Sequence, residues 1–155
     1  MITIDNLDHT IQTLLKKYPN TEKIFTPDKP PQNLSVKTLK KFKSYVPQQE
    51  TIKLGAIYVI LGFITLGFVI THNALHYRLQ NGFMALPKSG HLPLKEITHL
   101  KAEHRFSHPC YKGSNPGPAF WVNNQEIGWT QVLMVMSDED EAFLIDLFNH
   151  LTPKS

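Results

Sequence analysis

The sequence predicts an α+β domain in which two short helices precede several short antiparallel strands and one C-terminal helix closes the chain. Three observations lead to this fold class: an uncharged apolar segment over 54–70, alternating runs separated by turn residues over 75–136, and an amphipathic pattern over 138–151. A length of 155 residues suits one domain with a real core. Hydrophobic residues at 41% and charged residues at 19% are typical of a folded chain, not a disordered one.

The region 1–34 is expected to contain one helix and a linker, followed by the main domain over 35–155. Apolar residues recur at helical spacing over residues 6–18. They are Leu7, Ile11, Leu14, Leu15 and Tyr18. Residues 26–33 are proline-rich and have no periodic pattern, which is typical of a linker.

A second helix is predicted from Ser35, a good N-cap residue, to Val46. Its polar side carries three lysines, Lys37, Lys40 and Lys41. We interpret this lysine side as a solvated face, and contact with an anionic surface is the alternative.

The uncharged segment 54–70 admits two interpretations. A bilayer span needs about 20 apolar residues, and the lysines before the segment would place that end in the cytoplasm. Many of its residues are β-branched, and glycines interrupt it, which favours two buried strands joined near Gly62 to Gly67. We expect two antiparallel strands over 54–72, with a membrane helix as the alternative.

Downstream of this segment, the pattern predicts strands and tight turns. Residues 75–79 alternate, and Asn81-Gly82 is a strong hairpin turn leading into a strand over 83–86. Residues 87–90 predict a second turn. Asn123-Asn124 predicts a further hairpin, and residues 131–136 another apolar strand.

The C-terminal helix is the clearest element of the sequence. Ser137 is a good N-cap, and the acidic residues 138–141 place negative charge at the positive end of the helix dipole. Asp140 occupies the position at which a capping box has its acidic member. We expect the apolar face, with Phe143, Leu147 and Leu151, to be buried against the sheet.

Several segments together match the pattern of a known domain family. Residues 35–46 are expected to form a short leading helix, and residues 67–78 a hairpin in which an apolar strand ends at Thr and resumes as an aromatic strand ending in Arg. Residues 92–97 enter the next strand, and a small-turn hairpin follows at 123–127. These segments resemble a bacterial family of pleckstrin-homology-like (PH-like) domains. The resemblance implies a half-open barrel of about seven strands closed by the C-terminal helix, and it implies little about activity.

The connection at 61–67 is apolar, whereas the family has a polar, often acidic, connection there. An apolar loop is either covered by the chain or used for contact. The first helix is expected to cover Phe63, Ile64 and Leu66. The alternative is a contact surface formed by these residues and the lysines of the second helix, Lys37, Lys40 and Lys41.

Catalytic and metal motifs are not evident. His104, His108 and Cys110 lie close together, but a closed zinc site needs four ligands with paired spacing, and no second pair completes one. Catalysis by Cys110 would need a base and an orienting group. Trp121 and Trp129 are expected to be core or cross-strand partners. We therefore expect no metal, no cofactor and no enzymatic activity, with a Cys- or metal-dependent enzyme as the weakest alternative.

The function expected from these observations is that of a non-enzymatic binding module in the cytoplasm. Its partner would be a protein segment, bound by strand addition or in a groove beside the C-terminal helix, or a second copy of the chain. The alternative is a protein associated with the inner membrane through 54–72, or through the apolar loop and the lysine face. A net charge of +3 is too small to predict nucleic acid as a partner. The N-terminus has no signal-peptide pattern, and the single cysteine excludes an internal disulfide.

Overall fold

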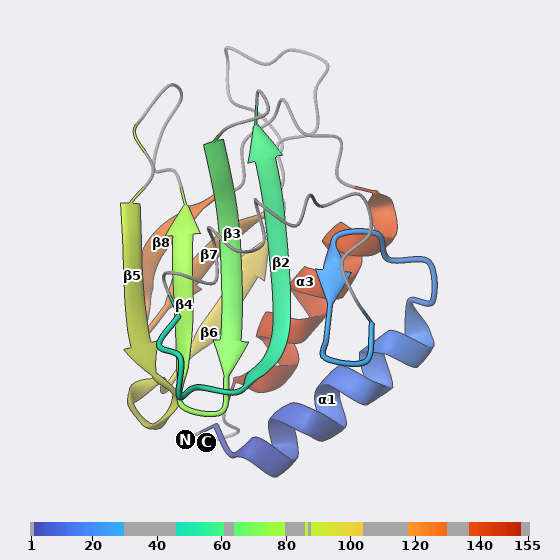
Figure 1. The fold of residues 1–155 in the computed structure, drawn as a ribbon, viewed down its shortest axis with the longest axis horizontal. Coiled ribbons are helices and arrows are strands. Elements are labelled where there is room, and N and C mark those ends of the chain that lie inside the picture. The colour runs from blue at the N-terminus through green and yellow to red at the C-terminus, as the bar shows by residue number, and fades with distance from the viewer. Residues whose placement is uncertain are drawn as a thin grey trace.

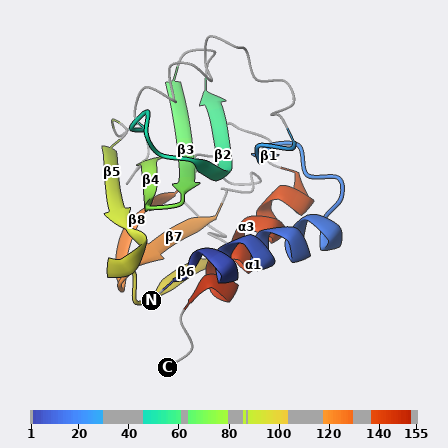
Figure 2. The same ribbon diagram turned by 60° about the horizontal axis from the view of Figure 1, so that its bottom comes forward.

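The computed structural model describes residues 2–29, 46–60, 64–79, 86, 88–103, 118–129 and 137–152. Within these residues the chain forms two antiparallel sheets that face each other, with two helices along one side (Figures 1 and 2). The α+β class is therefore confirmed, and the strands form two sheets instead of one closed barrel.

The five-stranded sheet has the strand order β1-β2-β3-β4-β5, and the three-stranded sheet has the order β6-β7-β8. The helices are α1 (Ile4–Lys17) and α3 (Asp138–Leu151), and a short 3-10 turn covers Leu94–Glu96. The strands are β1 (Ile24–Phe25), β2 (Ile52–Ile60), β3 (Ile64–Thr71), β4 (Ala74–Leu79), β5 (Lys88–Pro93), β6 (Leu100–Glu103), β7 (Ala119–Val122) and β8 (Gln125–Trp129).

The apolar segment that admitted two interpretations forms two antiparallel strands, β2 and β3, as expected. Their pairing continues to Ile60 opposite Ile64, so β3 begins inside the seven-residue loop predicted at 61–67. That loop prediction was wrong, because the β-branched residues at 64 and 65 continue the ladder. Among the described residues, no helix is both long enough and apolar enough to cross a membrane.

Gly67 allows β3 to follow this path. Its φ is +135°, and a Cβ atom at this position would overlap the carbonyl oxygen of Ala56 on β2. A side chain at this position is therefore excluded by both conformation and space. The strand then ends at Thr71, whose hydroxyl oxygen accepts the backbone N–H groups of Asn73 and Ala74 and so stabilises the turn into β4.

One predicted strand partner and one predicted turn differ from the structure. Leu79 at the end of β4 pairs with Lys88, so the partner of β4 is β5 and not the predicted strand 83–86, while Asn81-Gly82 lies outside the described residues. Residues 88–90, predicted as a turn, belong to β5. Both errors arise because strand register depends on tertiary pairing, which local turn signals do not specify.

The hairpin predicted at Asn123-Asn124 is confirmed. Both residues have positive φ, 51° and 66°, which a two-residue turn of the type common in hairpins requires. The side chain of Asn123 stabilises this turn further. Its Oδ1 accepts hydrogen bonds from the backbone of Thr98 and His99, and its Nδ2 donates to the carbonyl of Glu96.

Helix α3 packs its apolar face into the core, as predicted for Phe143, Leu147 and Leu151, each exposed by 1% or less. Ser137 is its N-cap and accepts the N–H of Asp140. The centre of the core is aromatic: Phe68 of β3, Phe120 of β7 and Phe148 of α3 lie with ring centroids 4.7 to 5.5 Å apart. One cluster of rings therefore joins both sheets to the helix.

Helix α1 begins two residues before its predicted start, because Thr3 caps it by accepting the N–H of Asn6. Its apolar face, with Leu7, Ile11 and Leu14, is buried in the same core as α3. Figures 1 and 2 place α1 against α3, at the opposite end of the molecule from the end of β2 and the start of β3. The expectation that this helix covers the apolar connection at 61–67 assumed that its apolar face had no other partner, and α3 is that partner.

Polar contacts attach the start of the chain to α3. The Asp146 carboxylate accepts hydrogen bonds from Lys17 and Tyr18, at 2.7 and 2.6 Å. The Asp140 carboxylate accepts the N–H groups of Glu22 and Lys23, although its side chain is fully buried. The acidic first turn of α3 therefore holds the segment before β1, in addition to its favourable position in the helix dipole.

Strand β1 was not predicted. It pairs with β2 through Ile24 and Phe25, and a bridge joins Thr26 to Lys29, so the part of the linker that is described is ordered by the sheet. The ring of Phe25 occupies the place that a side chain at Gly55 would need. A two-residue strand carries no periodic signal, so only pairing with β2 defines it.

Candidate binding site at the edges of the two sheets

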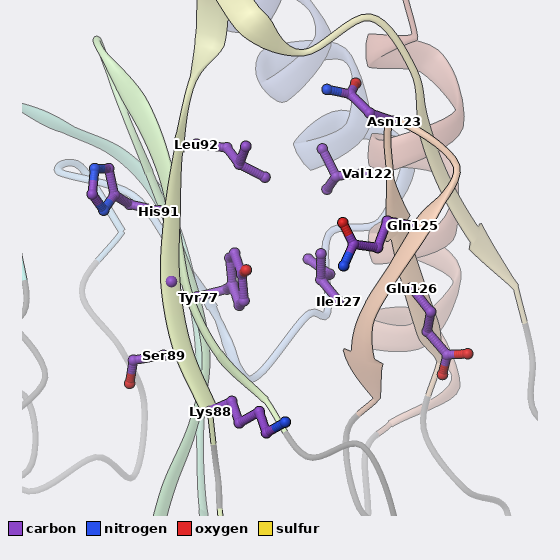
Figure 3. A pocket seen from close by; sticks show the side chains of 11 residues that line it. Tyr77, Lys88, Ser89, His91, Leu92, Val122, Asn123, Gln125, Glu126 and Ile127 are labelled. Atoms are coloured by element: carbon purple, nitrogen blue, oxygen red, sulfur yellow. The ribbon is translucent and has the colours of Figure 1, made fainter.

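A cavity of about 390 Å³ lies between β5, the last strand of one sheet, and β8, the last strand of the other. We call this site the β5–β8 seam. Figure 3 shows β5 along one side of the cavity and the β7–β8 hairpin along the other. Within the described part of the chain, neither strand has a second strand partner on the seam side.

Both apolar and polar side chains of the two sheets form the walls of the seam. Figure 3 shows the apolar side chains that point into the cavity, Tyr77, Leu92, Val122 and Ile127, and the Gln125 amide points into it beside Ile127. The neighbouring side chains of β5, Ser89 and His91, point to the outer face of the sheet. This alternation follows from the two-residue period of a strand, so the seam is built by the same pattern that forms the core.

Gly90 and Tyr77 form the middle of the β5 wall. They are direct cross-strand partners, and a Cβ atom at Gly90 would overlap the phenol ring of Tyr77. The ring therefore lies across the glycine and covers the backbone of β5 at this point. A larger residue at 90 would displace the ring from this position.

Polar groups line the ends of the seam. Lys88 lies at one end of β5, and Gln125 and Asn123 belong to the β7–β8 hairpin (Figure 3). Asn123 is committed to the turn, as described above. Glu126 lines the opening but points away from the cavity, so Lys88 is the charged side chain that points into it among the labelled residues.

The opposite edge of the three-stranded sheet is covered by α3. Asn149 Oδ1 accepts the N–H of Ala102, and Thr152 Oγ1 accepts the N–H of Leu100 on β6. The Thr152 hydroxyl also donates to the carbonyl of Leu100. Helix side chains thus bind the backbone groups that an added strand would need, which argues against a binding groove between α3 and β6.

A second polar cluster lies on the outer face of the five-stranded sheet. Residues 46–51 cross this face, and Val46 packs there on Ile57 and Val69. Glu50 in this segment accepts a hydrogen bond from Thr71 Oγ1 at 2.5 Å and lies 2.7 Å from His76 Nε2. The His76 ring stacks on His91 of β5, so the cluster reaches the back of the seam strand.

Burial acts to raise the pKa of Glu50, but the hydrogen bonds from Thr71 and His76 outweigh it and hold the pKa below its ordinary value. The carboxylate is therefore charged in the folded protein at neutral pH. With side-chain exposures of 12% for Glu50 and 8% for His76, the pair is largely shielded from water. We assign it a structural role, because it fastens residues 46–51 to β3 and β4.

Most of the contact surface predicted from the sequence lies outside the described residues. This applies to Phe63, Lys37, Lys40 and Lys41. Ile64 and Leu66 belong to β3 and pair with Ile60 and Tyr58. The structure therefore does not bring the predicted loop and lysine face together into one described surface.

Of the histidine, cysteine and tryptophan positions considered from the sequence, some lie within the described residues and others lie outside them. His104, His108 and Cys110 lie outside the described residues. His72 Nδ1 accepts the N–H of Thr51. In the residues that the structure describes, no three His, Cys, Asp or Glu side chains are grouped so as to hold a metal ion.

Of the two tryptophans, Trp121 lies half-buried on β7 beneath the Lys101 ammonium, 5.0 Å from the ring centroid, and Trp129 is the last residue of β8. Trp121 faces neighbours on its own sheet, as predicted for a cross-strand partner.

The residues of the seam were recognised in the sequence only as strand residues. Leu92 and Tyr77 were assigned to apolar contacts and to an alternating strand, and nothing indicated that they face a cavity. To predict the seam from the sequence, one would have needed to know the β4–β5 register, in which Tyr77 pairs with Gly90. A glycine beside a predicted aromatic strand is the one signal available, because such glycines mark close approach of another group.

Comparison with known proteins identifies no family for this chain. No family model matches it, and neither curated proteins nor solved structures give a significant match. Its function is therefore argued from the geometry of the site.

Proposed function

We propose that this protein is a non-enzymatic binding module that takes up an extended protein segment by strand addition at the β5–β8 seam. The module has a PH-like half-open barrel plan in this proposal. Four long strands, β2 to β5, precede three more, β6 to β8, and then the C-terminal helix, which supports that plan.

The observation that carries the proposal is that two sheet edges, β5 and β8, flank one cavity into which apolar side chains of both sheets point. An edge strand presents N–H and C=O groups that need partners, and an added strand supplies them. The adjacent cavity then receives every second side chain of that strand. A compact ligand would fill the cavity without using either edge.

A comparison of the edge strands by length and by accessibility also supports strand addition at β5. The β6 edge is covered by Asn149 and Thr152, while β1, at the other end of the large sheet, is only two residues long. Strand β5 is six residues long and mostly exposed or half-exposed. Among the described edges, β5 therefore offers the longest ladder to a partner.

The test is a selection of random linear peptides displayed on phage against the immobilised protein, followed by amide hydrogen exchange with the best synthetic peptide. We expect protection of amides in β5 or β8 on binding, with β6 unchanged. The same peptide with N-methyl groups at alternate positions should bind at least tenfold more weakly, because it lacks half of its backbone donors.

Two variants of β5 give a matched pair. Leu92→Gln changes a side chain that points into the seam, and Ser89→Gln changes one on the outer face of the same strand. The first should weaken peptide binding and the second should not. Protection confined to other elements, or equal binding by the N-methylated peptide, would refute strand addition.

A further inference from the structure

Lys88 gives one end of the seam a positive charge. Its side chain is exposed and points toward the opening between the strands (Figure 3). None of the ion pairs in the described part of the chain involves it. Glu126, the acidic residue at the opening, points away. A bound carboxylate at this end would therefore meet an ammonium group that no carboxylate of the described residues already pairs with.

The inward positions of β5 form an ordered series along the strand. Lys88, Gly90 and Leu92 share the seam face, because side chains alternate along a strand. Alternate residues are about 7 Å apart, so the ammonium end and the Leu92 end are separated by about 13 Å. The Tyr77 ring lies at the middle position, across Gly90. The surface therefore runs from charged to aromatic to aliphatic.

A strand added to β5 would present its own alternate side chains to these three positions. The first would lie near the Lys88 ammonium, and the second against the Tyr77 ring. The third would face Leu92, with Val122 and Ile127 across the cavity. Opposite charge suits the first position, and apolar side chains suit the other two.

We infer that the partner is an extended segment with one acidic and two apolar side chains at three successive alternate positions, the acidic side chain being at one end of the three. This inference rests on the proposed strand addition and specifies its partner. The order of the three side chains along the partner depends on whether it pairs parallel or antiparallel to β5. The pattern itself is the same in both cases.

The test uses synthetic, end-blocked peptides in which two valines at alternate positions are preceded or followed by glutamate, and the same peptides with lysine in its place. Affinities are measured by fluorescence anisotropy at low ionic strength. One glutamate peptide should bind about two- to fivefold tighter than its lysine counterpart, as expected for a solvent-exposed ion pair. In Lys88→Glu the preference should reverse, so that the lysine peptide binds tighter.

The control is Lys95→Glu, which makes the same change of charge at an exposed position outside the seam and should leave the preference for glutamate intact. Equal affinity of the glutamate and lysine peptides for the unmodified protein would overturn the inference and leave strand addition standing. Failure of every peptide to bind would instead count against strand addition itself.

A second copy of the chain is the competing occupant of the seam. Sedimentation of the protein alone would then show a concentration-dependent dimer that the peptides dissociate, and that result would also overturn the inference. We expect no such dimer.

Discussion

Glu50 connects three segments of the chain on the outer face of the large sheet. Its carboxylate receives Thr71 and His76, which lie on two neighbouring strands, and it belongs to neither strand. Hydrogen bonds to a shielded charged group contribute more than those between neutral groups, about 1.5–3 kcal/mol each. This side chain therefore helps to hold residues 46–51 on the sheet, together with the packing of Val46 and the hydrogen bonds between Thr51 and His72.

Replacement of Glu50 should lower stability in a pH-dependent way. Because the folded pKa of Glu50 lies below its unfolded value, its contribution is complete above about pH 4.3 and is lost as the pH falls through the lower folded pKa. We expect Glu50→Gln to reduce the free energy of unfolding by about 1–3 kcal/mol at pH 7 and by less at about pH 3, which lies below the unfolded pKa. Urea unfolding at both pH values measures this difference.

Glu103→Gln is the control for that measurement. Glu103 pairs with Lys101 on the surface, and both side chains are 49% exposed. Its replacement should change stability by about 0.5 kcal/mol or less. An equal loss in both variants would show that the Glu50 contacts have no special weight.

Gly90 should be equally sensitive to a single methyl group. In Gly90→Ala the new Cβ must displace the Tyr77 ring or bend β5, and such overpacking costs about 1–3 kcal/mol. Thermal unfolding measures the loss, and Ser89→Ala on the outer face is the comparison. A Gly90→Ala protein as stable as Ser89→Ala would mean that the ring moves freely, and the aromatic wall would then be no fixed part of the seam.

At the scale of elements, α3 does three things at once. Its apolar face fills the core, its last turn covers the β6 edge, and its first turn holds the segment before β1. The last of these roles depends on Asp140, whose carboxylate is buried and accepts two backbone N–H groups. A buried carboxylate is tolerated only when it is hydrogen-bonded in this way.

Asp140→Ala should therefore destabilise the protein far more than Asp138→Ala. The first variant leaves the N–H groups of Glu22 and Lys23 without their acceptor and removes a contact to Ser137, so we expect a loss of about 2–4 kcal/mol. Asp138 lies on the same helical turn but is exposed, and its removal should cost about 0.5 kcal/mol. Denaturant unfolding compares the two. Similar losses would mean that the dipole, and not the loop contact, explains the acidic turn.

Leu147 tests the other face of the same helix. It is fully buried, so Leu147→Ala should cost about 2–5 kcal/mol in the free energy of unfolding. Ile145 is only partly buried, and Ile145→Ala should cost clearly less. The two midpoints in urea, measured side by side, give the comparison. An unchanged midpoint for Leu147→Ala would contradict the core position of α3.

At the scale of the whole molecule, the elements with strong periodic or capping signals were predictable. The sequence indicated α1, α3, the β2–β3 pair and the Asn123-Asn124 turn, because periodicity, caps, β-branched residues and turn residues are local signals. The β4–β5 register and β1 depend on strand pairing that no local signal specifies, and they were missed. The seam belongs to this second group, since it exists only where the edges of two sheets meet.

The contacts between α3 and the N-terminal segment affect how the chain folds while it is being synthesised. Asn20 binds the Glu139 carboxylate, which lies 119 positions later in the chain. While the ribosome is still making the strands, α1 has left the exit tunnel but its partner does not yet exist. Its apolar face must stay exposed or be held by a chaperone until residues 139–151 emerge. Nascent chains arrested before α3 should therefore bind ribosome-associated chaperones, and chains arrested after it has left the tunnel should release them.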